Sequence, residues 1–350
     1  MPLSTTRILS LIPAIMACLC MGACAGCSAQ RQSEADSASV SPRHQADAAD
    51  IPSFSADSAY AYVSRQVEMG PRVNNTPSHR SCEQWLVSSL RKFGADTVIE
   101  QRAVVSDHAG RALDINNIIA RFNPSATKRI LLLAHYDTRP AADQDPDPAN
   151  RDKPVPGAND GASGVGVLME VARQLGMQMP QIGVDILMTD AEDCGTDEGP
   201  DSELTWALGT QYFMDHLPYA SYADMPAYAI LLDMVGGAGA TFKREYFSQR
   251  YAPEINAKVW NAARDAGLSA RFQSGQGPGV VDDHVFVNRG GIPAIDIIEC
   301  ENAQTGSFPP YWHTLADDMP VIDRSTLGDV GTVLMHIIYT ETVPADTDKP

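Results

Sequence analysis

The sequence predicts an α/β fold with three layers, α/β/α, around a central, mostly parallel mixed sheet. Short apolar runs recur along the chain, and stretches of helical periodicity lie between them. Acidic residues and histidines repeatedly follow the apolar runs. Runs that are apolar throughout are typical of strands buried on both faces. The alternation of such strands with helices favours a parallel sheet that helices cover on both sides.

The expected strands are residues 130–134, 182–188, 229–232 and 295–298. The first expected helix follows Gly161, with Leu168, Val171, Ala172 and Leu175 on one face. Two more helices are expected over roughly residues 253–266 and 325–339. In sheets of this kind, binding sites form where the strands end and the loops begin.

The N-terminal residues are expected to lie outside this domain. Arg7 precedes an apolar run over residues 8–23, which is the layout of a secretory signal. A small residue precedes Cys24 and again Cys27, as in a bacterial lipobox, although an ordinary cleaved signal is the alternative. We therefore expect an exported, periplasmic protein of the bacterial envelope that is held by a lipid anchor. The expected segments are a signal over 1–27, a disordered tether over 28–52, a single catalytic domain over 53–342 and a polar tail over 343–350.

The net charge of −18 argues against a nucleic-acid partner, which would require a basic face. After the signal, only Cys82, Cys194 and Cys300 remain, so the sequence has neither a disulfide framework nor a CxxC metal site. Cys194 and Cys300 lie near the residues that we assign to the active site, where they are either paired or two buried thiols. The sequence leaves the oligomeric state open.

Nearly every expected strand is followed by a carboxylate or a histidine. Taken alone, each of these residues has an ordinary explanation as a turn, a helix cap or a solvated surface. Carboxylates crowded at one edge of a sheet repel each other, and a divalent cation would relieve that repulsion. Oxygen and nitrogen ligands without thiolates suit zinc in a catalytic site. The residues concerned are His135, Asp137, Asp160, Asp190, Glu192, Asp193, Asp233, Asp282, Asp283, His284, Asp296 and His313.

Several ordered motifs carry a resemblance to a known family. They are HYDT at 135–138, GANDGASG at 157–164, DAED at 190–193, LLDMVG at 231–236 and WHT at 312–314. Together they resemble the zinc-dependent aminopeptidase superfamily, which includes the glutaminyl cyclases. The resemblance covers about residues 55–339 and implies the metal-dependent α/β fold expected above.

The resemblance leaves two branches open. Two-zinc aminopeptidases would use His135, Asp160, Asp193, Asp233 and His313 as ligands, whereas the cyclases bind one zinc through the equivalents of Asp160, Asp193 and His313. Three neighbouring features resemble the cyclases more: Trp206, the aromatic run from Phe308 to Trp312, and the sequence Asp282-Asp283-His284. Two residues depart from the animal cyclases, which carry glutamate at Asp193 and histidine at Asp296.

The favoured branch implies an enzyme that converts the N-terminal glutamine of peptides and proteins into pyroglutamate, releases ammonia and uses one zinc ion. Glu192 would carry the proton, with Asp233 and Asp282 as its partners. Trp206, Phe308 and Trp312 would form the substrate pocket together with Asp296, for which a merely structural hydrogen bond is the alternative. The competing readings are a two-zinc aminopeptidase, in which His135 binds the second metal, and a degenerate domain that serves as a binding module.

Overall fold

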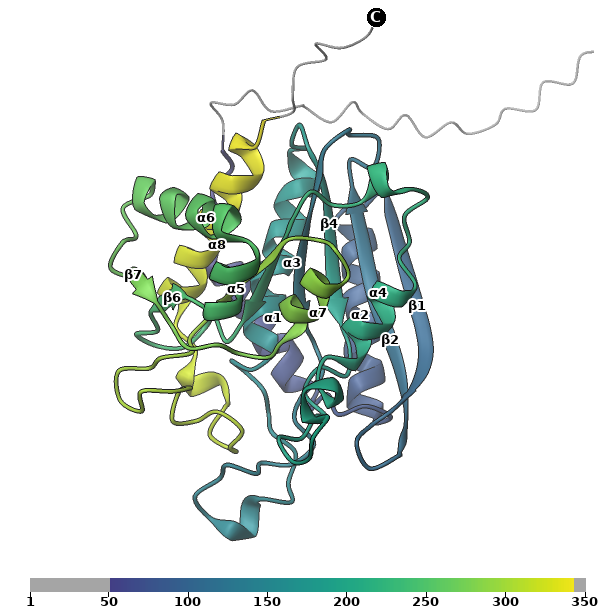
Figure 1. The fold of residues 1–350 in the computed structure, drawn as a ribbon, viewed down its shortest axis with the longest axis vertical. Helices are drawn as coiled ribbons and strands as arrows, with labels where there is room; N and C mark the ends of the chain where they lie inside the picture. Colours follow the sequence, from purple (N-terminus) through teal and green to yellow (C-terminus); the bar gives the residue numbers. More distant parts are fainter. Residues whose placement is uncertain (1–50, 343–350) are drawn as a thin grey trace, which may run out of the picture. The chain divides into compact units, whose positions relative to one another are not determined.

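The computed structural model describes residues 51–342 (Figure 1). The predicted signal, the tether up to residue 50 and the tail lie outside the described residues. A six-stranded sheet forms the centre, in the order β1-β2-β4-β3-β5-β8. Its strands are β1 (Thr97–Ser106), β2 (Ala112–Phe122), β3 (Arg129–His135), β4 (Gly183–Thr189), β5 (Ala229–Asp233) and β8 (Ala294–Ile298).

The sheet is mixed and mostly parallel, as the sequence predicts. Strands β4, β3, β5 and β8 run parallel to one another, whereas β1 and β2 form an antiparallel pair at one edge. The four parallel strands are the ones that the apolar runs indicate. A second, two-stranded sheet consists of β6 (Phe242–Arg244) and β7 (Phe272–Gln276).

Helices cover both faces of the large sheet, which confirms the three-layer prediction. Along β3, Ile130 and Leu132 pack into one apolar cluster, while Leu131 and Leu133 pack into another on the opposite face. The first cluster is covered by α1 (Ala56–Glu68), α2 (Pro77–Lys92), α3 (Ala162–Met177) and α8 (Arg324–Thr340). The second is covered by α4 (Leu208–Asp215) and α7 (Asp283–Arg289), and α5 (Tyr246–Tyr251) and α6 (Pro253–Asp265) pack beside β8.

Short 3-10 helices lie in the connecting loops, at Pro148–Asn150, Ser202–Thr205, Tyr222–Asp224 and Met319–Val321. Helices α1 and α2 and the β1–β2 pair were not among the elements expected from the sequence. Strand β1 is mostly half-buried or exposed, so it lacks the continuous apolar run that marks the inner strands. Among residues 51–342, no helix is both long enough and apolar enough to cross a membrane.

Two glycines allow α3 to approach the sheet closely. At Gly164, a β-carbon would lie 2.2 Å from the main-chain oxygen of Leu232 in β5. At Gly161, where φ is +89°, a β-carbon would lie 2.9 Å from the main-chain oxygen of Asp137. The N-terminus of α3 therefore lies directly against the ends of β3 and β5, and the turn before it brings Asp160 to the same place.

Candidate active site

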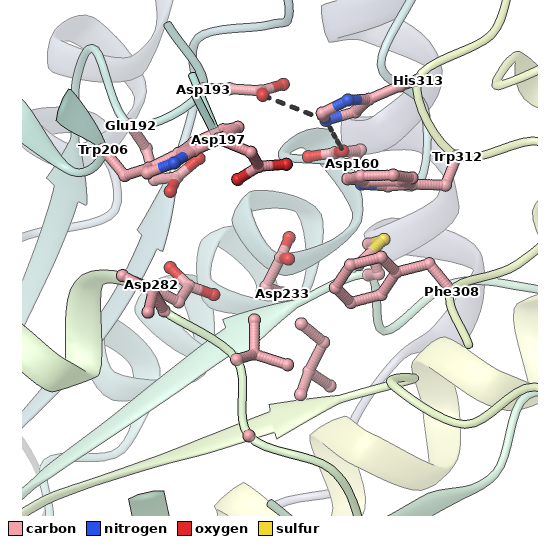
Figure 2. Close-up of a pocket in the computed structure, with 15 residues that line it drawn as sticks. Asp160, Glu192, Asp193, Asp197, Trp206, Asp233, Asp282, Phe308, Trp312 and His313 are labelled. Atoms are coloured by element: carbon pink, nitrogen blue, oxygen red, sulfur yellow. Dashed lines mark ion pairs between the residues drawn. The ribbon is translucent and has the colours of Figure 1, made fainter. Parts of the chain in front are cut away.

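The ends of the parallel strands bring most of the predicted residues together (Figure 2). His135 ends β3 and Asp233 ends β5, while Glu192 and Asp193 follow β4. Asp160 lies in the turn before α3. His313 comes from the loop between β8 and α8, and Asp282 caps the N-terminus of α7.

The carboxylate of Asp160 lies between two histidines. Its Oδ1 is 3.1 Å from Nε2 of His135, and its Oδ2 is 3.7 Å from Nε2 of His313. The ligand atoms of Asp160, Asp193 and His313 lie within 4.8 Å of one another, and so do those of His135, Asp160 and Asp233. Both predicted ligand sets are therefore assembled, and they share Asp160.

The set of Asp160, Asp193 and His313 fits a zinc ion. Both carboxylate oxygens of Asp193 are buried and accept no hydrogen bond within the described part of the chain, although Nε2 of His313 lies 3.2 Å from one of them. On the other side of the imidazole ring, Nδ1 of His313 lies 3.1 Å from Oδ1 of Asp143. A histidine that donates to a carboxylate through one nitrogen presents the other to a metal, which is the usual arrangement in zinc sites.

The loop that carries Glu192 and Asp193 is anchored through its main chain. The N–H groups of both residues donate to the carboxylate of Asp137, each at 3.1 Å. Arg139 donates to the main-chain oxygens of Asp193, at 3.2 Å, and Gly195, at 2.8 Å. These contacts fix the direction in which the two acidic side chains point.

Four residues in or beside the site adopt a left-handed backbone that residues other than glycine rarely take. They are Ala191 (φ +50°), Ala207 (φ +53°), Met234 (φ +46°) and His313 (φ +54°). Each lies at or next to one of the site residues. Such conformations persist only where surrounding contacts enforce them, and they concentrate at functional sites.

Crowding of the carboxylates changes their protonation. Burial and the neighbouring Asp282 raise the pKa of Glu192 well above its ordinary value. Burial and Asp233 have the same effect on the pKa of Asp282. The pKa of Asp233 is raised to about 6 by burial and by Asp160. Burial would also raise the pKa of Asp160, but the hydrogen bond from His135 outweighs it and the net shift is downward. The site therefore contains acids with different proton affinities, which suits acid–base chemistry.

A pocket of about 230 Å³ opens onto these residues. Trp206, Phe308 and Trp312, the three aromatic residues expected to form the substrate pocket, lie around it, and the ring centroids of Phe308 and Trp312 are 4.5 Å apart. Trp206 packs directly on Gly195, where a β-carbon would lie 2.3 Å from the indole ring. The lining residues are Asp160, Glu192, Asp193, Asp197, Trp206, Asp233, Met234, Gly279, Val280, Val281, Asp282, Ile298, Phe308, Trp312 and His313.

Asp296 does not reach the pocket wall, which was one of the two roles that the sequence left open for it. Asp296 is fully buried and does not line the pocket. Its main-chain N–H donates to Oγ of Ser248, and its carboxylate lies 3.9 Å from Nδ1 of His284. Asp296 and Ile298 point to the same face of β8, because they lie two residues apart. Ile298 ends the strand and reaches the pocket wall, whereas Asp296 lies deeper in the strand and is covered.

Sequence reasoning missed several residues that shape the site. Arg139 and Asp143 lie in a loop that is rich in aspartate and proline, and no local pattern distinguishes Asp143 from the other acids there. Asp137 was recognised only as one of the acids that follow a strand, without the anchoring role that the structure shows. Asp197 was not singled out.

The three cysteines among residues 51–342 do not form a disulfide. Cys82, Cys194 and Cys300 are all buried and free. Cys194 and Cys300 pack in separate apolar clusters, so the alternative of two buried thiols describes the structure.

Comparison with known proteins agrees with the motifs. The model of peptidase family M28 matches residues 117–338. The structure of a glutaminyl cyclase from Bacteroides thetaiotaomicron is 46% identical, with a TM-score of 0.81, over 84% of this chain and 100% of that one. A leucine aminopeptidase precursor from the same organism is also 46% identical, with a TM-score of 0.80, over 84% of this chain and 99% of its own. The glutaminyl-peptide cyclotransferase of Bos taurus is 24% identical over 76% of this chain and 77% of its own length. The resemblance drawn from the motifs is thus confirmed.

Proposed function

The chain belongs to peptidase family M28, and we propose that it is a glutaminyl cyclase that converts N-terminal glutamine of peptides and proteins into pyroglutamate. One observation carries this proposal. The carboxylates of Glu192, Asp233 and Asp282 line a pocket with aromatic walls, immediately beside the ligand set of Asp160, Asp193 and His313. The similarity to glutaminyl cyclases supports the same activity.

The pocket suits the side chain of glutamine. A carboxamide is flat, and its NH₂ group donates hydrogen bonds that the carboxylates of Asp233 and Asp282 accept. An aliphatic side chain such as leucine would bury these carboxylates without giving them a partner, which costs free energy. The rings of Trp206, Phe308 and Trp312 hold the flat amide and exclude water. Exclusion of water matters because attack by water would give glutamate instead of pyroglutamate.

Asp160, Asp193 and His313 would hold one zinc ion. When bound there, zinc supplies Lewis-acid polarisation of the γ-carbonyl group of the substrate. The ligands consist of two carboxylates and one imidazole, which leaves a position for the substrate, as in other catalytic zinc sites.

Glu192 moves the proton in the proposed reaction. The α-amine nitrogen of the substrate forms a bond to the carbonyl carbon (Cδ) of its own side-chain amide, and the bond between that carbon and the amide nitrogen breaks. Glu192 takes a proton from the amine and delivers it to the leaving nitrogen, which departs as ammonia. Its raised pKa, caused by burial and by Asp282, suits a group that must both take and give a proton. Asp282 and Asp233 keep Glu192 and the departing nitrogen in place through hydrogen bonds.

A two-zinc aminopeptidase is the second candidate function. The assembled set of His135, Asp160 and Asp233 favours it, because these residues would complete a second metal site. The similarity to a leucine aminopeptidase precursor also supports it. In this alternative, Asp233 is a metal ligand and does not contact the substrate amide.

A direct comparison of substrates tests the proposal. The purified chain without residues 1–27 is given a glutaminyl peptide and a leucyl amide, and released ammonia and free leucine are measured together with bound zinc. Formation of ammonia and pyroglutamyl product with one zinc per chain is the expected result. Leucine release without cyclisation, with two zinc ions per chain, would establish the aminopeptidase instead.

We also propose that the protein is exported and held at the bacterial envelope by a lipid on Cys24 or Cys27. The support is the apolar run over residues 8–23 and the small residue before each cysteine. Cells fed a labelled fatty acid should label the wild-type chain, and replacement of both cysteines by alanine should abolish the label. Equal labelling of that variant would contradict the anchor.

A further inference from the structure

Asp197 differs from the other carboxylates that line the pocket. Asp160, Glu192, Asp193, Asp233 and Asp282 are all buried, and each lies among the other site residues. The side chain of Asp197 is exposed, so it lies at the mouth of the pocket. Figure 2 shows its carboxylate directed into the pocket, between Trp206 and Asp160.

The main chain around Asp197 is held in place. The N–H of Thr196 donates to Oγ1 of Thr205 at 2.9 Å, and that hydroxyl is 2.6 Å from the main-chain oxygen of Ser202. The N–H of Glu198 donates to Oγ1 of Thr196 at 3.2 Å. The first bond ties the residue before Asp197 to the segment that carries Trp206, and the last one closes the turn around Asp197. The position of its carboxylate is therefore coupled to the pocket wall.

The charge of Asp197 is not neutralised by a neighbour. Among residues 51–342, no hydrogen bond or ion pair reaches its carboxylate. Two cationic side chains that contact residues 202–206 are already occupied: Arg139, which lies over the ring of Trp206, pairs with Asp143, and Arg289 pairs with Glu203. A charged group at the mouth of a pocket, with no partner of its own, is available to the part of a substrate that projects from the pocket.

This placement identifies the part of the substrate that Asp197 meets. If the chain is a glutaminyl cyclase, on which this inference rests, the glutamine side chain fills the pocket and the next residue projects through the mouth. We propose that Asp197 is a specificity-determining residue that favours a lysine or arginine directly after the N-terminal glutamine and disfavours an acidic residue there.

The expected preference for a cationic second residue is moderate, because water partly solvates both its charge and that of Asp197. At a separation of about 5 Å in water, the attraction between Asp197 and a lysine should raise kcat/KM roughly four-fold over a neutral side chain of similar length. An acidic side chain should lower it by a similar factor. At a salt concentration of about 1 M the Debye length is about 3 Å, so most of this preference should disappear.

The experiment uses the full catalytic chain and tripeptide amides that begin with glutamine and end with alanine. The middle residue is lysine, methionine or glutamate, and kcat/KM is measured for each from ammonia release. The wild type should rank lysine above methionine and methionine above glutamate. In Asp197→Asn, the kcat/KM values of the three peptides should lie within about two-fold of one another. Glu198→Gln is the matched control, because Glu198 is the exposed neighbouring acid that does not line the pocket, and it should keep the wild-type ranking.

The outcomes separate this inference from the proposed function. If the wild type cyclises all three peptides at equal rates, Asp197 does not select the second residue and the inference is wrong. It is equally wrong if Asp197→Asn lowers kcat/KM by the same factor for all three, since Asp197 would then act on a feature common to every substrate. If no peptide is cyclised by the wild type, the proposed function itself fails.

Discussion

Zinc affinity should depend on Asp143, a residue that does not touch the metal. Asp143 lies 3.1 Å from Nδ1 of His313. Burial would raise the pKa of Asp143, but the hydrogen bonds with His313 and Arg139 lower it to about 2, so it is ionised at neutral pH. Asp143→Asn keeps the shape and an acceptor oxygen while removing the charge that makes His313 a stronger ligand.

The loss of zinc affinity in Asp143→Asn should be modest. Replacing the carboxylate behind a metal-bound histidine weakens metal binding by about 10–100-fold, or about 1.4–2.8 kcal/mol. The side chain of Asp143 is 36% exposed, and water therefore screens part of its charge. We expect the lower end of that range, about ten-fold.

Competition with a coloured zinc chelator measures this affinity, starting from protein freed of metal. Asp152→Asn is the matched control: it lies in the same loop, is exposed, and makes no hydrogen bond or ion pair within residues 51–342. At saturating zinc, Asp143→Asn should regain most of its activity. Unchanged zinc affinity in Asp143→Asn would refute the reasoning, because His313 would then either not bind zinc or not depend on Asp143.

Three further predictions follow from the same structure. Glu192→Gln should lower kcat roughly 10²–10⁴-fold, because it removes the proton carrier, while bound zinc measured by mass spectrometry stays the same. Gly195→Ala should raise KM about ten-fold, because its methyl group would displace the ring of Trp206 from the pocket wall. Glu341→Gln should lower the free energy of unfolding by about 1–2 kcal/mol at pH 7 and by less than half as much at a pH of about 3, as urea titrations would show. Burial would raise the pKa of Glu341 from its ordinary 4.5, but the hydrogen bond from Lys128 lowers it to about 2, so its stabilising contribution is complete above pH 4.5 and disappears as the pH falls through 2.

Each of these predictions has a result that would contradict it. Full activity of Glu192→Gln would exclude Glu192 as the proton carrier. For Gly195→Ala, an unchanged KM would show that Trp206 does not contact the substrate, provided that the unfolding midpoint matches the wild type. For Glu341→Gln, an equal loss of stability at both pH values would mean that the charge of Glu341 has no part in the effect.

The inner strands and the principal site residues were predictable from local sequence. A strand buried on both faces must be apolar throughout, so β3, β4, β5 and β8 are visible as apolar runs. Polar residues that end such strands meet at one edge of a parallel sheet, which is why His135 and Asp233 were found without coordinates.

The remaining features depend on contacts between distant segments. Asp143 meets His313 across 170 residues of chain, and neither local sequence contains a sign of the other. Asp296 shares a face of β8 with Ile298 but lies deeper in the strand, and the sequence does not specify how far along a strand the pocket reaches. The direction of Asp197 depends on the hydrogen bonds of its loop with Thr205. The positions of the inner strands and the residue types at their ends thus follow from short-range patterns. The strand order, the residues behind the metal ligands and the mouth of the pocket follow from packing between distant segments, which no short-range pattern encodes.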